Sequence, residues 1–143
     1  MKRALVVAGA LVLGISAVAA QDPIAARKAL MKDTGKNAGA GAAMVRGEAP
    51  FDLAKAKAIF VAFQDTATKA PGLFPDSAKA GEDTAALPKI WESKADFDAK
   101  FVKLGADAKA AEASVTDLDS FKTAFSGVTK NCGGCHELYR LKK

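Results

Sequence analysis

The residues best suited to chemistry in this 143-residue chain form the run Cys132-Gly133-Gly134-Cys135-His136. They include the only two cysteines and the only histidine of the chain. Two cysteines separated by two residues and followed at once by histidine form the C-x-x-C-H pattern of c-type haem attachment. This spacing lets two thiols form thioethers on one side of a porphyrin while the adjacent imidazole reaches the iron. The motif predicts one covalently attached haem c per chain, held by Cys132, Cys135 and the iron ligand His136.

Three other uses of the two thiols remain open at this point. A thioredoxin-like dithiol needs the motif at the start of a helix that follows a strand, where the helix dipole lowers a thiol pKa. A zinc site needs three or four protein ligands, and the chain offers one histidine and one cysteine pair. A structural disulfide is compatible with an oxidising compartment. Haem attachment is favoured because the motif ends a helical stretch and no strand precedes it.

The motif lies on the most regular helix that the sequence predicts, which begins after Asp117. Apolar positions recur there at intervals of three and four residues: Leu118, Phe121, Phe125, Val128, Cys132, Cys135 and Tyr139. Such a stripe forms the core-facing side of an amphipathic helix. Both thiols are therefore expected to face the interior.

Three further helices are expected along the chain. They are predicted from Asp22-Pro23 to Gly47, from Asp52 to Pro71, and from about Pro88 to Val115, by capping residues, prolines and three-four spacing. Glycines weaken the first by about 1 kcal/mol each, and would let a neighbouring helix or a second subunit come close. An irregular connection at residues 73–87 is expected to wrap an end or flank of the molecule. The predicted fold is all-α, an antiparallel up-down-up-down four-helix bundle with the haem near one end.

Residues 1–20 are predicted to be a signal peptide, and residues 21–143 a single domain. Lys2 and Arg3 precede a short apolar stretch that ends in the small residues Val18-Ala19-Ala20. The stretch is too short for a membrane span, which needs about 20 apolar residues. Acidic and basic residues are interleaved within a net charge of +5, without the basic block typical of nucleic-acid binding. We expect export to the periplasm, no membrane span and no nucleic-acid partner.

A single histidine excludes bis-histidine ligation within the chain, so the second axial position needs a different ligand or stays vacant. After removal of the signal peptide two methionines remain, Met31 and Met44, about 20 Å apart at 1.5 Å per helical residue. In an up-down-up-down bundle the end of the last helix lies beside the beginning of the first. This geometry favours Met31 as the second iron ligand. The alternative is a core methionine that covers the haem without bonding iron.

Basic residues near the predicted haem are candidate partners of its edge. Arg27 precedes Met31 by four residues, so it shares the same helix face one turn earlier. Its guanidinium is predicted to pair with a haem propionate, and the alternative is a solvated surface arginine. Arg140 and Lys130 are further candidates for contact with the haem edge or the imidazole.

The chain resembles the class II cytochromes c, which comprise the cytochromes c′ and their low-spin relatives, the cytochromes c-556. The resemblance spans essentially the whole mature chain and rests on residues 27–33, 46–50, 73–77, 88–91 and 132–140. It implies that the Met31 position separates low-spin proteins, with a methionine ligand, from five-coordinate c′ proteins that bind nitric oxide or carbon monoxide. The residues around Met31 and the 73–77 segment are closer to the low-spin type, whereas Arg27 is typical of c′.

The preferred interpretation is a periplasmic electron carrier, not an enzyme, with one haem c held by Cys132 and Cys135 and with His136 and Met31 as axial ligands. Its partners are expected to be redox proteins, and a homodimer is compatible with the small residues of the first helix. The alternative is a high-spin, gas-binding cytochrome c′. A dithiol oxidoreductase is a third hypothesis, which predicts free thiols and no visible absorbance.

Overall fold

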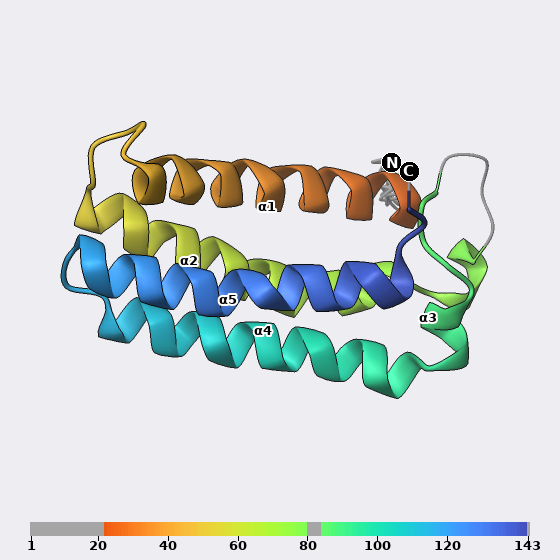
Figure 1. Ribbon diagram of the computed structural model, residues 1–143. Coiled ribbons are helices and arrows are strands. Elements are labelled where there is room, and N and C mark those ends of the chain that lie inside the picture. The colour runs from red at the N-terminus through yellow and green to blue at the C-terminus, as the bar shows by residue number, and fades with distance from the viewer. Residues whose placement is uncertain (1–21, 80–83, 143) are drawn as a thin grey trace, which may run out of the picture.

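The computed structural model describes residues 22–79 and 84–142, so the predicted signal peptide lies outside the described residues. Four long helices lie side by side, each running opposite to the one before (Figure 1). They are α1 (Pro23–Arg46), α2 (Leu53–Lys69), α4 (Lys94–Ser114) and α5 (Leu118–Tyr139). The predicted all-α, up-down-up-down four-helix bundle is confirmed.

Side-chain caps set the beginnings of three of these helices. The carboxylates of Asp22, Asp52 and Asp117 accept hydrogen bonds from backbone N–H groups of the first turn at distances between 2.8 and 3.4 Å. Such bonds satisfy donors that have no partner inside the helix. Gly47 ends α1 in the left-handed conformation, with φ of 74°, which glycine adopts without steric cost. The expected boundaries at these four residues are confirmed.

The expected continuous helix from Pro88 to Val115 is wrong at one position, Ser93. The chain instead forms a short helix α3 (Lys89–Glu92) and then α4. The φ and ψ of Ser93 are −127° and 44°, outside the helical region. Its N–H donates to the Lys89 carbonyl at 3.0 Å, and its own carbonyl accepts from the N–H of Phe97 at 3.0 Å. Ser93 therefore closes one helix and opens the next.

The connection between α2 and α3 wraps one end of the bundle, as expected (Figure 1). It contains two short 3₁₀ segments, η1 (Ala70–Leu73) and η2 (Asp76–Ala78). Its last part is bound to the chain just after α5. The Leu87 N–H donates to the Tyr139 carbonyl at 3.0 Å, and the Leu141 N–H donates to the Ala85 carbonyl at 2.8 Å. These backbone bonds fix the connection against the end of α5.

The helices are packed unequally around the core. Contacts are most extensive between α2 and α4, then between α4 and α5, whereas α1 and α5 touch least among neighbouring long helices. Gly41 is one place where α1 and α5 meet closely, because a Cβ atom there would lie 2.3 Å from Cε2 of Phe125. Gly35 and Gly39 have no neighbouring atom within 4 Å of such a Cβ. Close helix approach is thus confirmed at Gly41 alone among these three glycines.

Large aromatic side chains fill the core between the helices. The phenylalanines buried there are Phe60, Phe63, Phe74, Phe97, Phe101, Phe121 and Phe125. Most belong to α2, α4 and α5, so these three helices carry most of the aromatic packing.

Within the described ranges, no helix has the length and hydropathy to cross a membrane.

Candidate haem-attachment site

The C-x-x-C-H motif occupies the last two turns of α5. Cys132 and Cys135 are half-buried and continue the stripe on which Phe125, Val128 and Tyr139 are buried. Both thiols are free, with no disulfide between them. The predicted inward orientation is confirmed for Cys135, which packs against the core, whereas Cys132 is shown only to be half-buried.

The environment of the thiols does not favour the alternative uses of the motif. Burial raises the pKa of Cys132 and of Cys135 above the ordinary thiol value, whereas a reactive dithiol needs a lowered pKa. The motif also lies at the negative end of the α5 dipole, which disfavours a thiolate. Among the residues that the structure describes, no three histidine, cysteine or carboxylate groups gather in a way that could hold a metal ion.

His136 lies on the outer side of α5 and is exposed. It borders a surface hollow of about 430 Å³ whose other lining residues follow it or precede it on the same segment: Gly133, Glu137, Arg140, Leu141 and Lys142. Partial desolvation, and then the cation of Arg140, hold the pKa of His136 below its usual value. The lowered pKa favours the neutral form of the imidazole, which is the form that binds a metal.

Met31 lies in the third turn of α1, half-buried and packed against the core. The first turns of α1 and the last turns of α5 share one end of the bundle (Figure 1, orange-red and dark blue). Met31 and His136 therefore belong to the same end. Met44 is buried, with 4% of its surface exposed, and lies in the last turn of α1, at the other end.

The residues at this end fit a covalently bound haem. The seam between α1 and α5 is the least extensively packed seam of the bundle. At this end of the bundle α5 carries two half-buried thiols and one imidazole, and α1 carries one thioether sulfur, that of Met31. Sulfur and imidazole are the donor types that bind haem iron in cytochromes c. The donor atoms and their distribution over two helices both suit the haem that the C-x-x-C-H motif predicts.

Arg27 is buried, with only 4% of its surface exposed, so it is not a solvated surface arginine. Its Nη1 donates to the carbonyls of Leu73 at 3.4 Å and Ala78 at 3.2 Å, and its Nη2 donates to the Thr84 hydroxyl at 2.6 Å. The guanidinium also lies 4.9 Å from the ring centroid of Phe74, within the range of a cation–π contact. Burial lowers its pKa, although a guanidinium stays charged.

The role found for Arg27 is to hold the connection between α2 and α3 against the first turns of α1. Trp91 supports the same connection, because its indole N–H donates to the carbonyls of Phe74 at 3.1 Å and Pro75 at 3.2 Å. Sequence reasoning missed this role, since no pattern marks which distant backbone carbonyls an arginine will reach. A bond between Arg27 and a haem propionate stays a prediction.

A polar cluster beside the motif was also missed. The Tyr139 hydroxyl donates to Asp96 Oδ2 at 2.5 Å, and Lys100 Nζ lies 3.7 Å from the same oxygen. The three residues join α4 to the last turn of α5. The four-residue spacing of Asp96 and Lys100 signals an ion pair on one helix face, but the sequence does not show that Tyr139 joins it.

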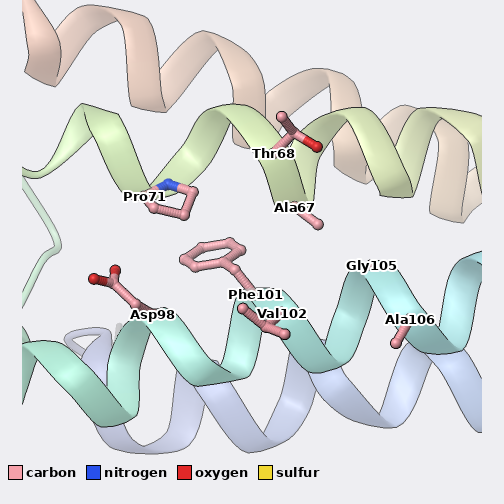
Figure 2. A pocket seen from close by; sticks show the side chains of 8 residues that line it. All are labelled: Ala67, Thr68, Pro71, Asp98, Phe101, Val102, Gly105 and Ala106. Atoms are coloured by element: carbon pink, nitrogen blue, oxygen red, sulfur yellow. The ribbon is translucent and has the colours of Figure 1, made fainter.

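A second hollow lies between α2 and α4. It measures about 450 Å³ and is mostly apolar, lined by Ala67, Thr68, Pro71, Asp98, Phe101, Val102, Gly105 and Ala106. Figure 2 shows the Phe101 ring pointing into it from α4, with Pro71 and Ala67 on the opposite side. None of these residues belongs to α1 or α5, so this hollow takes no part in the candidate haem site.

Comparisons with known proteins agree with this geometry. The family described as Cytochrome C′ matches residues 22–140. The chain is 48% identical to a cytochrome c′ of Rhodopseudomonas palustris over 99% of this chain and 97% of that protein. It is 39% identical to a cytochrome c-556 of the same organism over 100% and 99% of the two chains.

Solved structures show the same relationship. A cytochrome c′ from R. palustris superposes with a TM-score of 0.84 at 48% identity, covering 87% of this chain and 99% of that one. An NMR-validated model of oxidized R. palustris cytochrome c556 gives a TM-score of 0.80 at 35% identity, covering 87% and 99%. With its C-x-x-C-H motif on the last helix of this bundle, the chain belongs to the cytochrome c′ family of class II cytochromes c, whose cofactor is covalently attached haem c.

Proposed function

We propose that this protein is a periplasmic electron carrier, not an enzyme. In this proposal one haem c is attached through Cys132 and Cys135, with His136 and Met31 as its axial ligands. The observation that carries it is the placement of the motif and of Met31 at the same end of the bundle, on the two helices that pack least against each other. Bound haem supplies a one-electron ferric–ferrous couple.

The residues of the chain have separate tasks in this function. Cys132 and Cys135 are half-buried on one side of α5, so thioethers formed there would hold the macrocycle along that side of the helix. His136 offers a neutral imidazole, and Met31 offers a sulfur atom on α1. Methionine–histidine ligation raises the reduction potential of a haem. With both ligands held by packed helices, an electron can enter or leave without a change of ligands.

A second candidate function is that of a high-spin cytochrome c′ that binds nitric oxide or carbon monoxide. It is favoured by the greater identity to a protein named cytochrome c′, 48%, than to one named cytochrome c-556, 39%. In this alternative Met31 packs over the distal side without bonding iron. Its half-buried position in α1 suits either role.

One optical spectrum distinguishes the two candidates. The full chain is produced in a bacterium that exports it and attaches haem, and the mature protein is purified. A low-spin ferric spectrum, with slow carbon monoxide binding after reduction, supports the electron carrier. A high-spin ferric spectrum with fast carbon monoxide binding supports the cytochrome c′ alternative. Colourless protein with the mass of the bare polypeptide contradicts both.

The predicted signal peptide supports a periplasmic location for this chemistry. The proposal is checked by fractionating the producing cells. Mature protein that starts at about residue 21 and appears in the periplasmic fraction agrees with it, whereas haem-free protein retained in the cytoplasm contradicts it. Redox proteins of the same compartment are the proposed partners.

A further inference from the structure

The cluster formed by Tyr139, Asp96 and Lys100 lies beside the predicted attachment site. Two hydrogen bonds fix how α4 and α5 are aligned. Tyr139 donates to Asp96 at 2.5 Å, and eight residues earlier on α5 Asn131 donates to Asp107 Oδ2 at 2.8 Å. Cys135 lies midway between Asn131 and Tyr139, so it is opposite the middle of the Asp96–Asp107 stretch of α4.

The same alignment brings charged residues of α4 near Cys135. Asp96 and Lys100 lie within the stretch that the two hydrogen bonds hold opposite Cys135, and Lys100 Nζ is 3.7 Å from Asp96 Oδ2. A porphyrin attached at Cys135 therefore has the Asp96–Lys100 pair near its edge.

Tyr139 determines where the Asp96 carboxylate is held. The phenol is buried, with 3% of the residue exposed, and its ring stacks edge-on against Phe97, with centroids 5.2 Å apart. The carboxylate of Asp96 is itself 60% exposed, and Lys100 is 3.7 Å away. The short bond from a rigid, buried tyrosine thus keeps an otherwise mobile carboxylate turned toward α5.

We propose that Asp96, held in place by Tyr139, is a fixed negative charge that lowers the reduction potential of the haem, with Lys100 acting in the opposite direction. This inference rests on the proposed function. A negative charge near the iron stabilises the ferric state, which carries one more positive charge than the ferrous state. Asp96 sets the charge, and Tyr139 is a positioning residue that acts through it.

The test is a redox titration of the purified haem protein and of Asp96→Asn. Removal of the charge is expected to increase the equilibrium constant for reduction about threefold, which is about 28 mV at 59 mV per tenfold for one electron. The exposure of the carboxylate keeps the shift this small, because water screens the charge. Lys100→Gln is expected to shift the potential the other way.

Asp98→Asn is the matched control. Asp98 lies on the same helix two residues further on, pairs with Lys94 and lines the hollow between α2 and α4. Asp98→Asn is expected to change the reduction potential by only a small fraction of the shift in Asp96→Asn. Equal shifts in the two variants, or a lowered potential in Asp96→Asn, would overturn the proposal.

Tyr139→Phe tests the positioning role. Without the hydroxyl the carboxylate turns into solvent, so the potential is expected to rise part of the way toward that of Asp96→Asn. Asp96→Asn should then add less in the Tyr139→Phe background than in the wild type. Fully additive shifts would show that Tyr139 does not hold the carboxylate. Urea unfolding of the wild type, Asp96→Asn, Tyr139→Phe and the double variant measures the contribution of the Tyr139–Asp96 hydrogen bond to stability. This measurement is independent of the haem potential.

Failure of this inference is distinguishable from failure of the proposed function. The mass of the wild-type protein reports haem attachment, and its ferric spectrum reports axial ligation. Attached haem with potentials that do not respond to Asp96 contradicts this inference alone. Absence of attached haem contradicts the proposed function itself.

Discussion

Gly41 of α1 lies so close to the Phe125 ring of α5 that an added Cβ atom would be 2.3 Å from Cε2 and 2.7 Å from Cζ of that ring. This contact sets the spacing of α1 and α5 away from the motif. Gly41→Ala is therefore expected to destabilise the fold by about 1–3 kcal/mol, as overpacking of a core does. Urea unfolding of the haem protein measures the change.

Gly35→Ala and Gly39→Ala are the matched controls, because nothing lies within 4 Å of a Cβ atom at either position. Each is expected to be neutral or to stabilise by up to about 1 kcal/mol, through the helix propensity of alanine. Equal effects at all three glycines would mean that the Phe125 contact does not limit the helix spacing.

Met31→Ala is expected to convert a low-spin ferric spectrum to a high-spin one, because it removes the proposed sulfur ligand. The reduced variant should bind carbon monoxide faster than the wild type, in which the ligand must first be displaced. Met44→Ala serves as control. It removes a buried methionine at the other end of α1, so it should cost about 2–5 kcal/mol of stability while the spectrum stays unchanged. An unchanged spectrum in Met31→Ala would contradict ligation by Met31.

Replacement of the cysteines tests covalent attachment. In Cys132→Ser or Cys135→Ser one thioether is lost, and in the double variant both are lost. Denaturing mass spectrometry should show no haem on the double variant, whereas the wild type keeps its haem after denaturation. Haem that stays covalently attached to the double variant would contradict the assignment of these two sulfur atoms.

Arg27→Met is expected to loosen the connection between α2 and α3. The substitution leaves the Leu73 and Ala78 carbonyls without their guanidinium donor, and bonds to a charged group are worth about 1.5–3 kcal/mol each. Hydrogen exchange at Leu87 and Leu141 should accelerate, since their N–H groups tie this connection to the end of α5.

Arg46→Met is the control for Arg27. Arg46 is exposed and pairs with Glu48, also exposed, at 2.7 Å, and such surface pairs contribute at most about 1 kcal/mol. Exchange at Leu87 and Leu141 should not change in this variant. Identical exchange rates in both variants would contradict the role of Arg27 in holding the connection between α2 and α3.

Stability above pH 10 is expected to depend on Tyr139. The hydrogen bond to Asp96, and then burial, raise the pKa of Tyr139 from 10 to about 12. Between these pH values the folded protein keeps the phenol proton and the unfolded chain loses it. The free energy of unfolding therefore falls as the pH rises from 10 to 12. Urea unfolding at pH 9 and pH 11 should show that the wild type loses more of its free energy of unfolding than Tyr139→Phe does. Equal losses in the two proteins would contradict the raised pKa of Tyr139.

The sequence was most informative where one residue determines local backbone structure. Asp22, Asp52, Asp117 and Gly47 mark helix ends through bonds and angles that are local, so their effect was predictable. The half-buried positions of the two cysteines were predictable for the same reason, since helical period alone assigns them to one face. Ser93 was missed, because serine is not a helix breaker and the three-four spacing continues across it.

Contacts between segments distant in the sequence could not be predicted from the sequence patterns. Arg27 reaches carbonyls 46 and 51 residues away, and a backbone carbonyl carries no sequence signal. Tyr139 was recognised as a core position, but its partner Asp96 is 43 residues away and shares no local spacing with it. Only the packing of α5 against α4 and of α1 against the connection brings these groups together.

The most extensive helix contact of the described chain joins α2 to α4, and neither helix carries a proposed attachment or axial-ligand residue. The proposed attachment residues and axial ligands all lie on α1 and α5, whereas α4 approaches the proposed site only through Asp96 and Lys100. A substitution at position 31 therefore lies outside the helix pair that dominates the core. Relatives named cytochrome c′ and cytochrome c556 share this architecture, with TM-scores of 0.84 and 0.80 to this chain.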